Sequence, residues 1–125
     1  MEYPAVIPAH WARHHRREDN ELLGYLCPVQ DAPGWFVPVT LFGHPLGGPS
    51  KEEDARQRLD RAGLDYLAQN WLLSLPGHPD PITVQIVEAT PQQLRVKNID
   101  YGYTEADIGR IFVLDVPVTG QLHPR

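Results

Sequence analysis

The sequence predicts an α+β fold, in which a mainly antiparallel sheet of about six or seven strands packs on one amphipathic helix. Short runs of β-branched and aromatic residues recur along the chain, and thirteen prolines fall mostly between them. Such spacing is typical of many short elements rather than of a proline-rich disordered tract. Only one stretch, residues 50–69, has a helical apolar stripe. We expect a single domain over residues 1–125, with irregular tails at 1–8 and 119–125.

Residues 8–27 favour a β-hairpin over a helix. A helix over residues 8–20 would have no apolar stripe to bury, because only alanines and Trp11 are apolar there. In the hairpin, residues 18–20 form the loop and Asn20 takes the left-handed conformation. The predicted register places Arg13 opposite Tyr25 and His15 opposite Leu23.

Residues 50–69 predict the helix. Ser50 and Glu53 have the Ser-x-x-Glu spacing of a capping box, and acidic residues follow in the first turn. The apolar stripe consists of Ala55, Leu59, Ala62 and Tyr66. Gly63 either ends the helix early or weakens its middle, and we expect the helix to reach Gln69.

Five further runs predict strands. Residues 34–42 are expected to be buried on both faces, with Pro38 leaving one side unpaired or bulged. Residues 71–75 and 110–116 are also expected to be strands. Residues 82–89 and 94–99 predict an antiparallel hairpin in which Ile86 pairs with Val96 on the buried face, and Gln85 pairs with Lys97 outside.

Charge and cysteine content narrow the classes of partner and compartment. The net charge is −5, which opposes general attraction to phosphate backbones. The single cysteine, Cys27, allows no internal disulfide, and no secretory signal or long apolar run is present. We therefore expect a cytoplasmic protein without a membrane partner. Cys27 itself is expected to be a small buried hydrophobe rather than a nucleophile.

The basic cluster RHHRRED, residues 13–19, raises the question of a metal or nucleic-acid site. A helical metal motif would need a glutamate after His10, where Trp11 stands, and no second ligand pair is present. We expect no metal and no cofactor. Arg13 and Arg17 alternate with Arg16 between the two faces of a strand, and acidic residues follow at once. The cluster is therefore interpreted as a charged hairpin tip, and nucleic-acid binding through residues 13–17 is the weakest functional alternative.

The glycine-rich loop before the helix, residues 43–50, has the geometry of a phosphate cradle. The Walker order is absent, and the expected cap would occupy the helix donors beside three acidic residues. We therefore expect a plain capped loop. Asp115, which interrupts an apolar strand, is expected to face solvent.

The loop at residues 98–109 carries Tyr101 and Tyr103, a residue type that suits binding surfaces. With no strong catalytic motif, the sequence favours a non-catalytic interaction module that binds another protein or a second copy of itself. The main alternative is a small-molecule-binding protein or small enzyme with a pocket between helix and sheet, using His44 with Tyr101 or Tyr103 as polar groups. The expectation that a tyrosine ring folds back over the core edge competes with the binding role.

Overall fold

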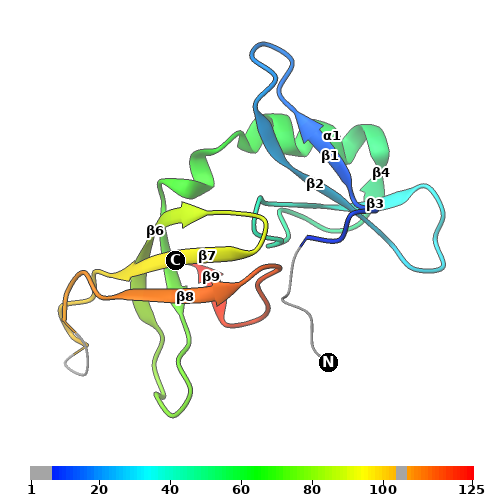
Figure 1. Cartoon of the computed structure of the whole chain (residues 1–125). Coiled ribbons are helices and arrows are strands. Elements are labelled where there is room, and N and C mark those ends of the chain that lie inside the picture. Colours follow the sequence, from blue (N-terminus) through cyan, green and yellow to red (C-terminus); the bar gives the residue numbers. More distant parts are fainter. Residues whose placement is uncertain (1–6, 104–106) are drawn as a thin grey trace.

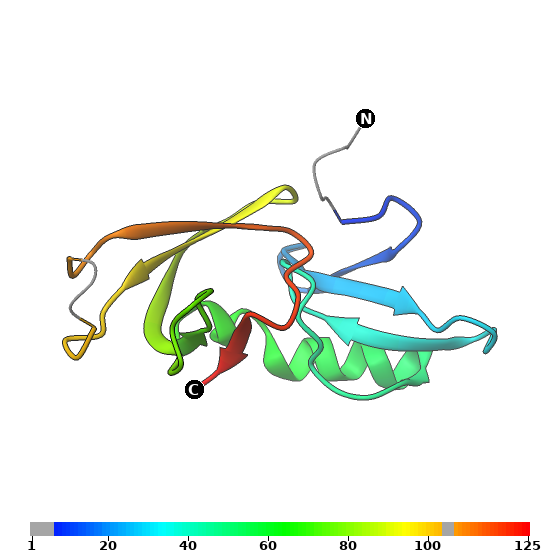
Figure 2. The same ribbon diagram turned by 90° about the horizontal axis from the view of Figure 1, so that it is seen from below.

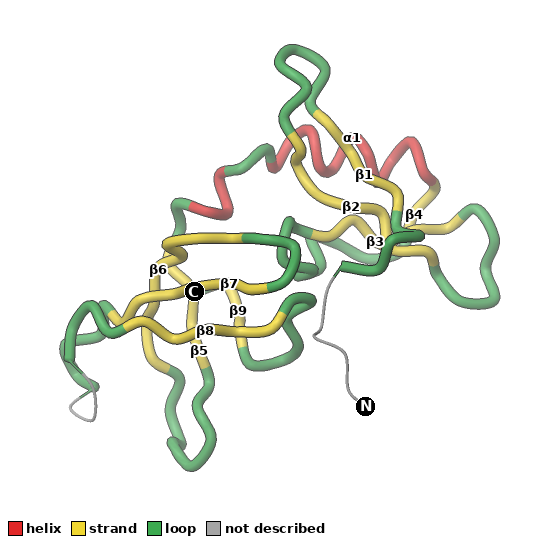
Figure 3. Tube along the Cα trace, in the orientation of Figure 1, coloured by secondary structure: helices red, strands yellow, loops and turns green. Residues whose placement is uncertain are grey.

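The computed structural model describes residues 7–103 and 107–125, and confirms the α+β class (Figure 1). One α-helix packs with two antiparallel sheets, one of four strands and one of five. The described residues thus contain nine strands, more than the six or seven predicted, because two very short strands complete the sheets (Figure 3). The helix lies along one face of the four-stranded sheet, and the five-stranded sheet lies beside it (Figure 2).

The four-stranded sheet has the order β1-β2-β3-β4 and begins with the predicted hairpin. Strands β1 (Ala12–His15) and β2 (Leu22–Pro28) are antiparallel, and Arg13 lies opposite Tyr25 as predicted. Asn20 has the predicted left-handed conformation, with φ of 59°. A bulge between His14 and His15 shifts the register, so His15 pairs with Leu22 instead of Leu23.

Strand β3 (Trp35–Val39) is less buried than predicted. Val39 is buried, but Trp35 is 40% exposed and has the ammonium of Lys51 over its ring. The expectation of burial on both faces was wrong because the helix covers only one face of this sheet. Pro38 has no N–H to donate, yet its carbonyl accepts a hydrogen bond from the Leu46 N–H at 2.8 Å.

The helix α1 (Glu52–Ala62) buries Ala55 and Leu59 completely, in contact with Leu26 of β2. The predicted capping box is wrong. Ser50 belongs to the two-residue strand β4 (Ser50–Lys51) and pairs with Phe36, so Lys51 occupies the N-cap without a side-chain cap.

Gly63 ends α1, which corrects the prediction that the helix reaches Gln69. Its φ of 53° lies in the left-handed region, which glycine adopts without strain, and its N–H donates to the Leu59 carbonyl. The chain continues as the short 3₁₀ helix η1 (Asp65–Leu67), which contains the buried Tyr66.

The five-stranded sheet has the order β8-β7-β6-β5-β9. Its strands are β5 (Asn70–Leu73), β6 (Ile82–Ala89), β7 (Gln93–Asn98), β8 (Ile111–Asp115) and β9 (Leu122–Pro124). The predicted pairs Ile86 with Val96 and Gln85 with Lys97 are confirmed. Strand β9 pairs with β5 and buries Leu122, so the segment 119–125 is not the irregular tail that we expected.

The larger apolar core lies against the five-stranded sheet, and it draws in residues that connect the two sheets. Phe42, which follows β3 in the chain, packs edge-on against Trp71 of β5 and Tyr66 of η1. The Val118 N–H donates to the Phe42 carbonyl at 2.9 Å. Near the start of the described chain, the Ile7 N–H donates to the Pro91 carbonyl, so part of the expected tail 1–8 contacts this core. Residues 1–6 lie outside the described residues.

No helix in the described ranges is long and apolar enough to cross a membrane.

Candidate functional site

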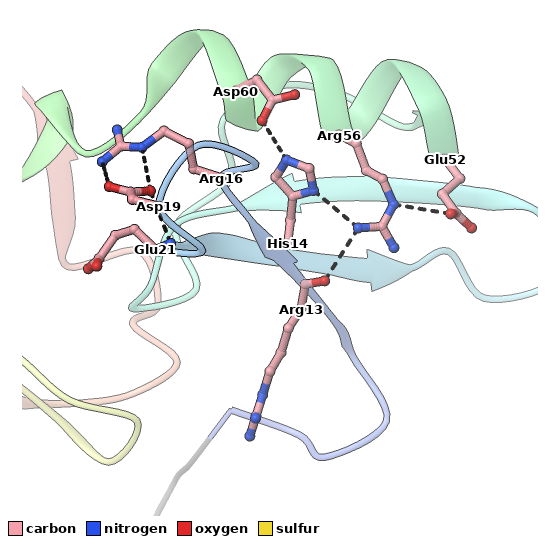
Figure 4. Close-up of polar contacts among 8 residues, drawn as sticks. All are labelled: Arg13, His14, Arg16, Asp19, Glu21, Glu52, Arg56 and Asp60. Atoms are coloured by element: carbon pink, nitrogen blue, oxygen red, sulfur yellow. Dashed lines mark hydrogen bonds and ion pairs between the residues drawn. The ribbon is translucent and has the colours of Figure 1, made fainter.

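A chain of polar contacts joins β1 to α1 at the basic hairpin (Figure 4). His14 Nε2 lies 2.7 Å from Asp60 Oδ1, and Arg56 Nη1 lies 3.1 Å from His14 Nδ1. An arginine donates but does not accept, so Nδ1 is the acceptor and Nε2 carries the proton that Asp60 accepts. Arg56 also donates to the Arg13 carbonyl and, through Nε, to Glu52.

This network is structural. His14 is 8% exposed, and both of its ring nitrogens are used within the protein. No nitrogen is left to take a proton from a substrate or to bind a metal ion. Residues 52, 56 and 60 are spaced by one helical turn, so the network fixes one side of α1 against the hairpin. Among the residues that the structure describes, no group of three or more His, Cys, Asp or Glu side chains is placed to hold a metal.

The three arginines of the predicted basic patch do not converge. Arg16 is held by Asp19 through two hydrogen bonds of 3.0 and 2.9 Å, and this contact lowers the pKa of Asp19 to about 2. The Arg13 side chain extends away from Arg16 and from α1 (Figure 4). Arg17 is exposed at the hairpin tip. The charge is thus dispersed over separate directions rather than gathered on one face, and part of it is neutralised locally.

The candidate ligand-binding residues also lie among different neighbours. Tyr101 is 87% exposed, whereas Tyr103 folds toward the core edge and packs edge-on against His78, with ring centres 4.9 Å apart. His44 packs edge-on against Trp71, and burial, followed by the nearby His123, lowers its pKa. The structure therefore does not assemble His44 and the tyrosines around one pocket.

Cys27 is half-buried, not the fully buried residue that the sequence predicted. Burial raises the pKa of the Cys27 thiol, which reduces the thiolate fraction that a nucleophile requires. Asp115 is exposed to solvent at the end of β8, as predicted.

The feature that sequence reasoning missed is a cavity of about 630 Å³ between strands β5 and β8 of the five-stranded sheet. Leu73 and Leu75 line it from the β5 side, and Phe112 and Leu114 line it from β8. Because β6 and β7 lie between β5 and β8 in the sheet order, the sheet must curl to bring these strands to one cavity. The polar groups in its wall are neutral: Ser74, Thr119 and Gln121.

Strand β8, which borders this cavity, is an open edge of the sheet. The Val116 N–H donates to the Gln92 carbonyl, and the Asn98 N–H donates to the Arg110 carbonyl. In the register of β7 and β8, these two bonds mean that the even-numbered residues of β8 turn their backbone groups toward β7. By that alternation the backbone groups of Ile111, Val113 and Asp115 point away from β7. No other described segment pairs with them. The side chains of Ile111 and Val113 are 37% and 52% exposed.

The apolar run Ile-Phe-Val-Leu at 111–114 predicts a strand, and the sequence holds no further signal for this edge. Which strand is the last of a sheet depends on pairing that the sequence does not reveal. Comparison with known proteins finds no matching family model, no similar curated protein and no similar solved structure.

Proposed function

We propose that the protein is a non-catalytic interaction module that binds an extended segment of another protein along strand β8. The observation that carries the proposal is the coincidence of an open, apolar strand edge with an apolar cavity beside it. An added strand forms main-chain hydrogen bonds with the edge, and its alternate side chains enter the cavity. This is the physical basis of peptide recognition by strand addition.

The other sheet edges are protected in ways that β8 is not. Strand β1 has four residues and carries the cationic Arg13, β4 has two residues, and β9 has three, including Pro124. Natural proteins blunt exposed edges by such means because an unprotected edge pairs with other chains. Strand β8 reads Ile-Phe-Val-Leu-Asp, contains no proline and has its one charged side chain at its last residue, so an added strand can pair with it.

The charges beside β8 define the chemistry of the partner segment. Arg95 lies opposite Val113 and Lys97 opposite Ile111 on the neighbouring strand, and Arg110 precedes β8. The cavity itself is apolar and has no charged residue in its wall. The segment that fits therefore alternates apolar residues, which face the cavity, with acidic residues, which face this basic border.

Fluorescence anisotropy with short labelled peptides tests the proposal. A peptide of alternating valine and glutamate should bind, while a valine–lysine peptide and a proline-interrupted peptide should bind much more weakly. The substitution Val113→Glu places a negative charge on the face that the glutamates of the peptide approach, and it should weaken binding of the valine–glutamate peptide by more than about tenfold. The matched control is Val87→Glu in β6, where Val87 is 47% exposed but does not lie at a sheet edge.

Equal loss of affinity in the two glutamate variants would contradict the proposal, as would equal binding of all three peptides. If the protein alone sediments as a dimer that Val113→Glu dissociates and Val87→Glu does not, the partner segment comes from a second copy of the chain. A small added mass in native mass spectrometry, with no peptide binding, would replace the proposal with an uncharged apolar ligand in the same cavity.

A further inference from the structure

A second cavity, of about 410 Å³, lies between the glycine-rich loop and the helix. Its wall combines Gly47, Gly48 and Ser50 from the loop with four residues of α1: Asp54, Gln57, Arg58 and Arg61. The helical residues are spaced at i, i+3, i+4 and i+7, so they share one face of α1. Neither the basic hairpin nor the edge strand β8 contributes to this cavity.

Hydrogen-bond donors dominate the wall. Arg58 Nε donates to the Leu46 carbonyl at 3.0 Å, which fixes the guanidinium over the loop and leaves its terminal nitrogens for another acceptor. Arg61 forms no ion pair with any described side chain. Within the described ranges, the N–H groups of Gly47 and Gly48 donate to no backbone carbonyl. Two arginines in the wall of one cavity, beside loop N–H groups that make no backbone hydrogen bond, suit an oxyanion.

The structure also removes an objection that the sequence raised. The Ser50 side chain was expected to cap the helix, but Ser50 lies in β4 and its hydroxyl makes no cap. Glu52, one of the three acidic residues, binds Arg56 on another side of the helix. Asp54 is therefore the one carboxylate in the wall of the cavity, beside two arginines.

We propose that this cavity binds the phosphate or carboxylate group of a small molecule, held by Arg58 and Arg61 against the glycine-rich loop. Arg61 lies seven positions after Asp54, a distance of about 10 Å along the helix axis. A ligand that fills the cavity therefore extends from its anionic group toward Asp54, where a neutral or hydrogen-bond-donating end is accommodated. This site is independent of peptide binding at β8.

Nuclear magnetic resonance of the ¹⁵N-labelled protein tests the site with two probes, inorganic phosphate and acetate. The amide signals of Gly47 and Gly48 should shift and saturate with at least one probe at constant ionic strength. The substitution Arg61→Gln should weaken that binding by about tenfold, because it removes a charge-assisted hydrogen bond. Asp54→Asn should instead strengthen it by about threefold, because it removes a repulsive charge. Arg17→Gln, the same change at a hairpin residue outside the cavity wall, is the matched control.

The preferred probe distinguishes a phosphate ligand from a carboxylate ligand. The proposal is overturned if sodium chloride produces the same glycine shifts, or if neither probe saturates. It is also overturned if Arg61→Gln and Asp54→Asn leave the affinity as unchanged as Arg17→Gln does.

Discussion

The Tyr66 hydroxyl joins three parts of the molecule through one side chain. It donates to the Leu23 carbonyl of β2 at 2.9 Å and accepts from the Leu41 N–H at 3.1 Å. Burial raises the pKa of this phenol well above its ordinary value, so it remains protonated and keeps its proton for Leu23. A single buried hydroxyl thus satisfies one backbone group of β2 and one of the segment that leads from β3 to the rest of the chain.

His44 should make the stability of the protein depend on pH. Burial lowers its pKa from the unfolded value of 6.5, so the unfolded chain binds a proton more readily than the folded one. The stability that the buried neutral imidazole contributes is present above pH 6.5 and is lost as the pH falls below this value. The free energy of unfolding should therefore decrease on acidification. Urea unfolding at about pH 7.5 and about pH 5.5 measures the difference. The variant His44→Gln should show a smaller decrease, and an unchanged decrease would contradict the role of His44.

Residue-level prediction succeeded where the cause is local. The left-handed Asn20 and the pair of Arg13 with Tyr25 follow from turn chemistry and strand alternation within one hairpin. The burial of His14 was not predicted, because its partners Arg56 and Asp60 lie more than 40 residues away in the sequence. A histidine within a basic run has no local feature that shows such a contact.

At the scale of the elements, Gly24 determines how closely the neighbouring segments approach β2. A Cβ atom at this position would lie 2.2 Å from the Val39 carbonyl oxygen and 2.8 Å from the Leu59 side chain. The substitution Gly24→Ala should therefore lower the free energy of unfolding by about 3 kcal/mol through overpacking. Gly120→Ala is the matched control, because a Cβ there meets nothing within 4 Å. Denaturant unfolding of both variants provides the comparison, and equal stabilities would be inconsistent with the close approach.

Element prediction from the sequence was accurate where a periodic pattern extends over several residues. The alternation in β6 and β7 predicted both their positions and their register. The two short strands β4 and β9 were missed because two or three residues carry no periodicity, and their pairing depends on distant partners. The end of α1 was placed too late because the apolar stripe continues to Tyr66, although Gly63 had already ended the helix.

At the scale of the whole molecule, the shared contacts of Phe42 and Tyr66 should make both sheets unfold together. Leu122→Ala in β9 leaves a cavity in the larger core and should cost about 3 kcal/mol. We expect hydrogen exchange to show an equal loss of protection in β2 and β6, although β2 lies in the other sheet. His123→Ala, a change at an exposed neighbouring position, should have little effect. Loss of protection in β6 alone would show that the sheets unfold separately.

The candidate sites could be predicted only in part from the sequence. The glycine-rich loop was recognised as a possible anion cradle, but its arginines come from a helical face eight or more residues further along. The apolar cavity draws on residues 73–76, 112–114 and 119–121, a combination with no sequence motif. The order of the strands determines both how the five-stranded sheet curls around this cavity and that β8 is its open edge. That order depends on pairing between residues far apart in the sequence.

The His14 contacts have a consequence for the opposite side of the helix. They hold Arg56 and Asp60 against β1. Each residue advances about 100° around an α-helix, so Arg58 lies about 200° from Arg56 and faces the other way. Together with the buried Ala55 and Leu59, the imidazole therefore helps to fix the rotation of α1 about its own axis. If an anion binds at the glycine-rich loop as proposed, replacing His14 should weaken that binding, although this histidine lies outside the cavity wall.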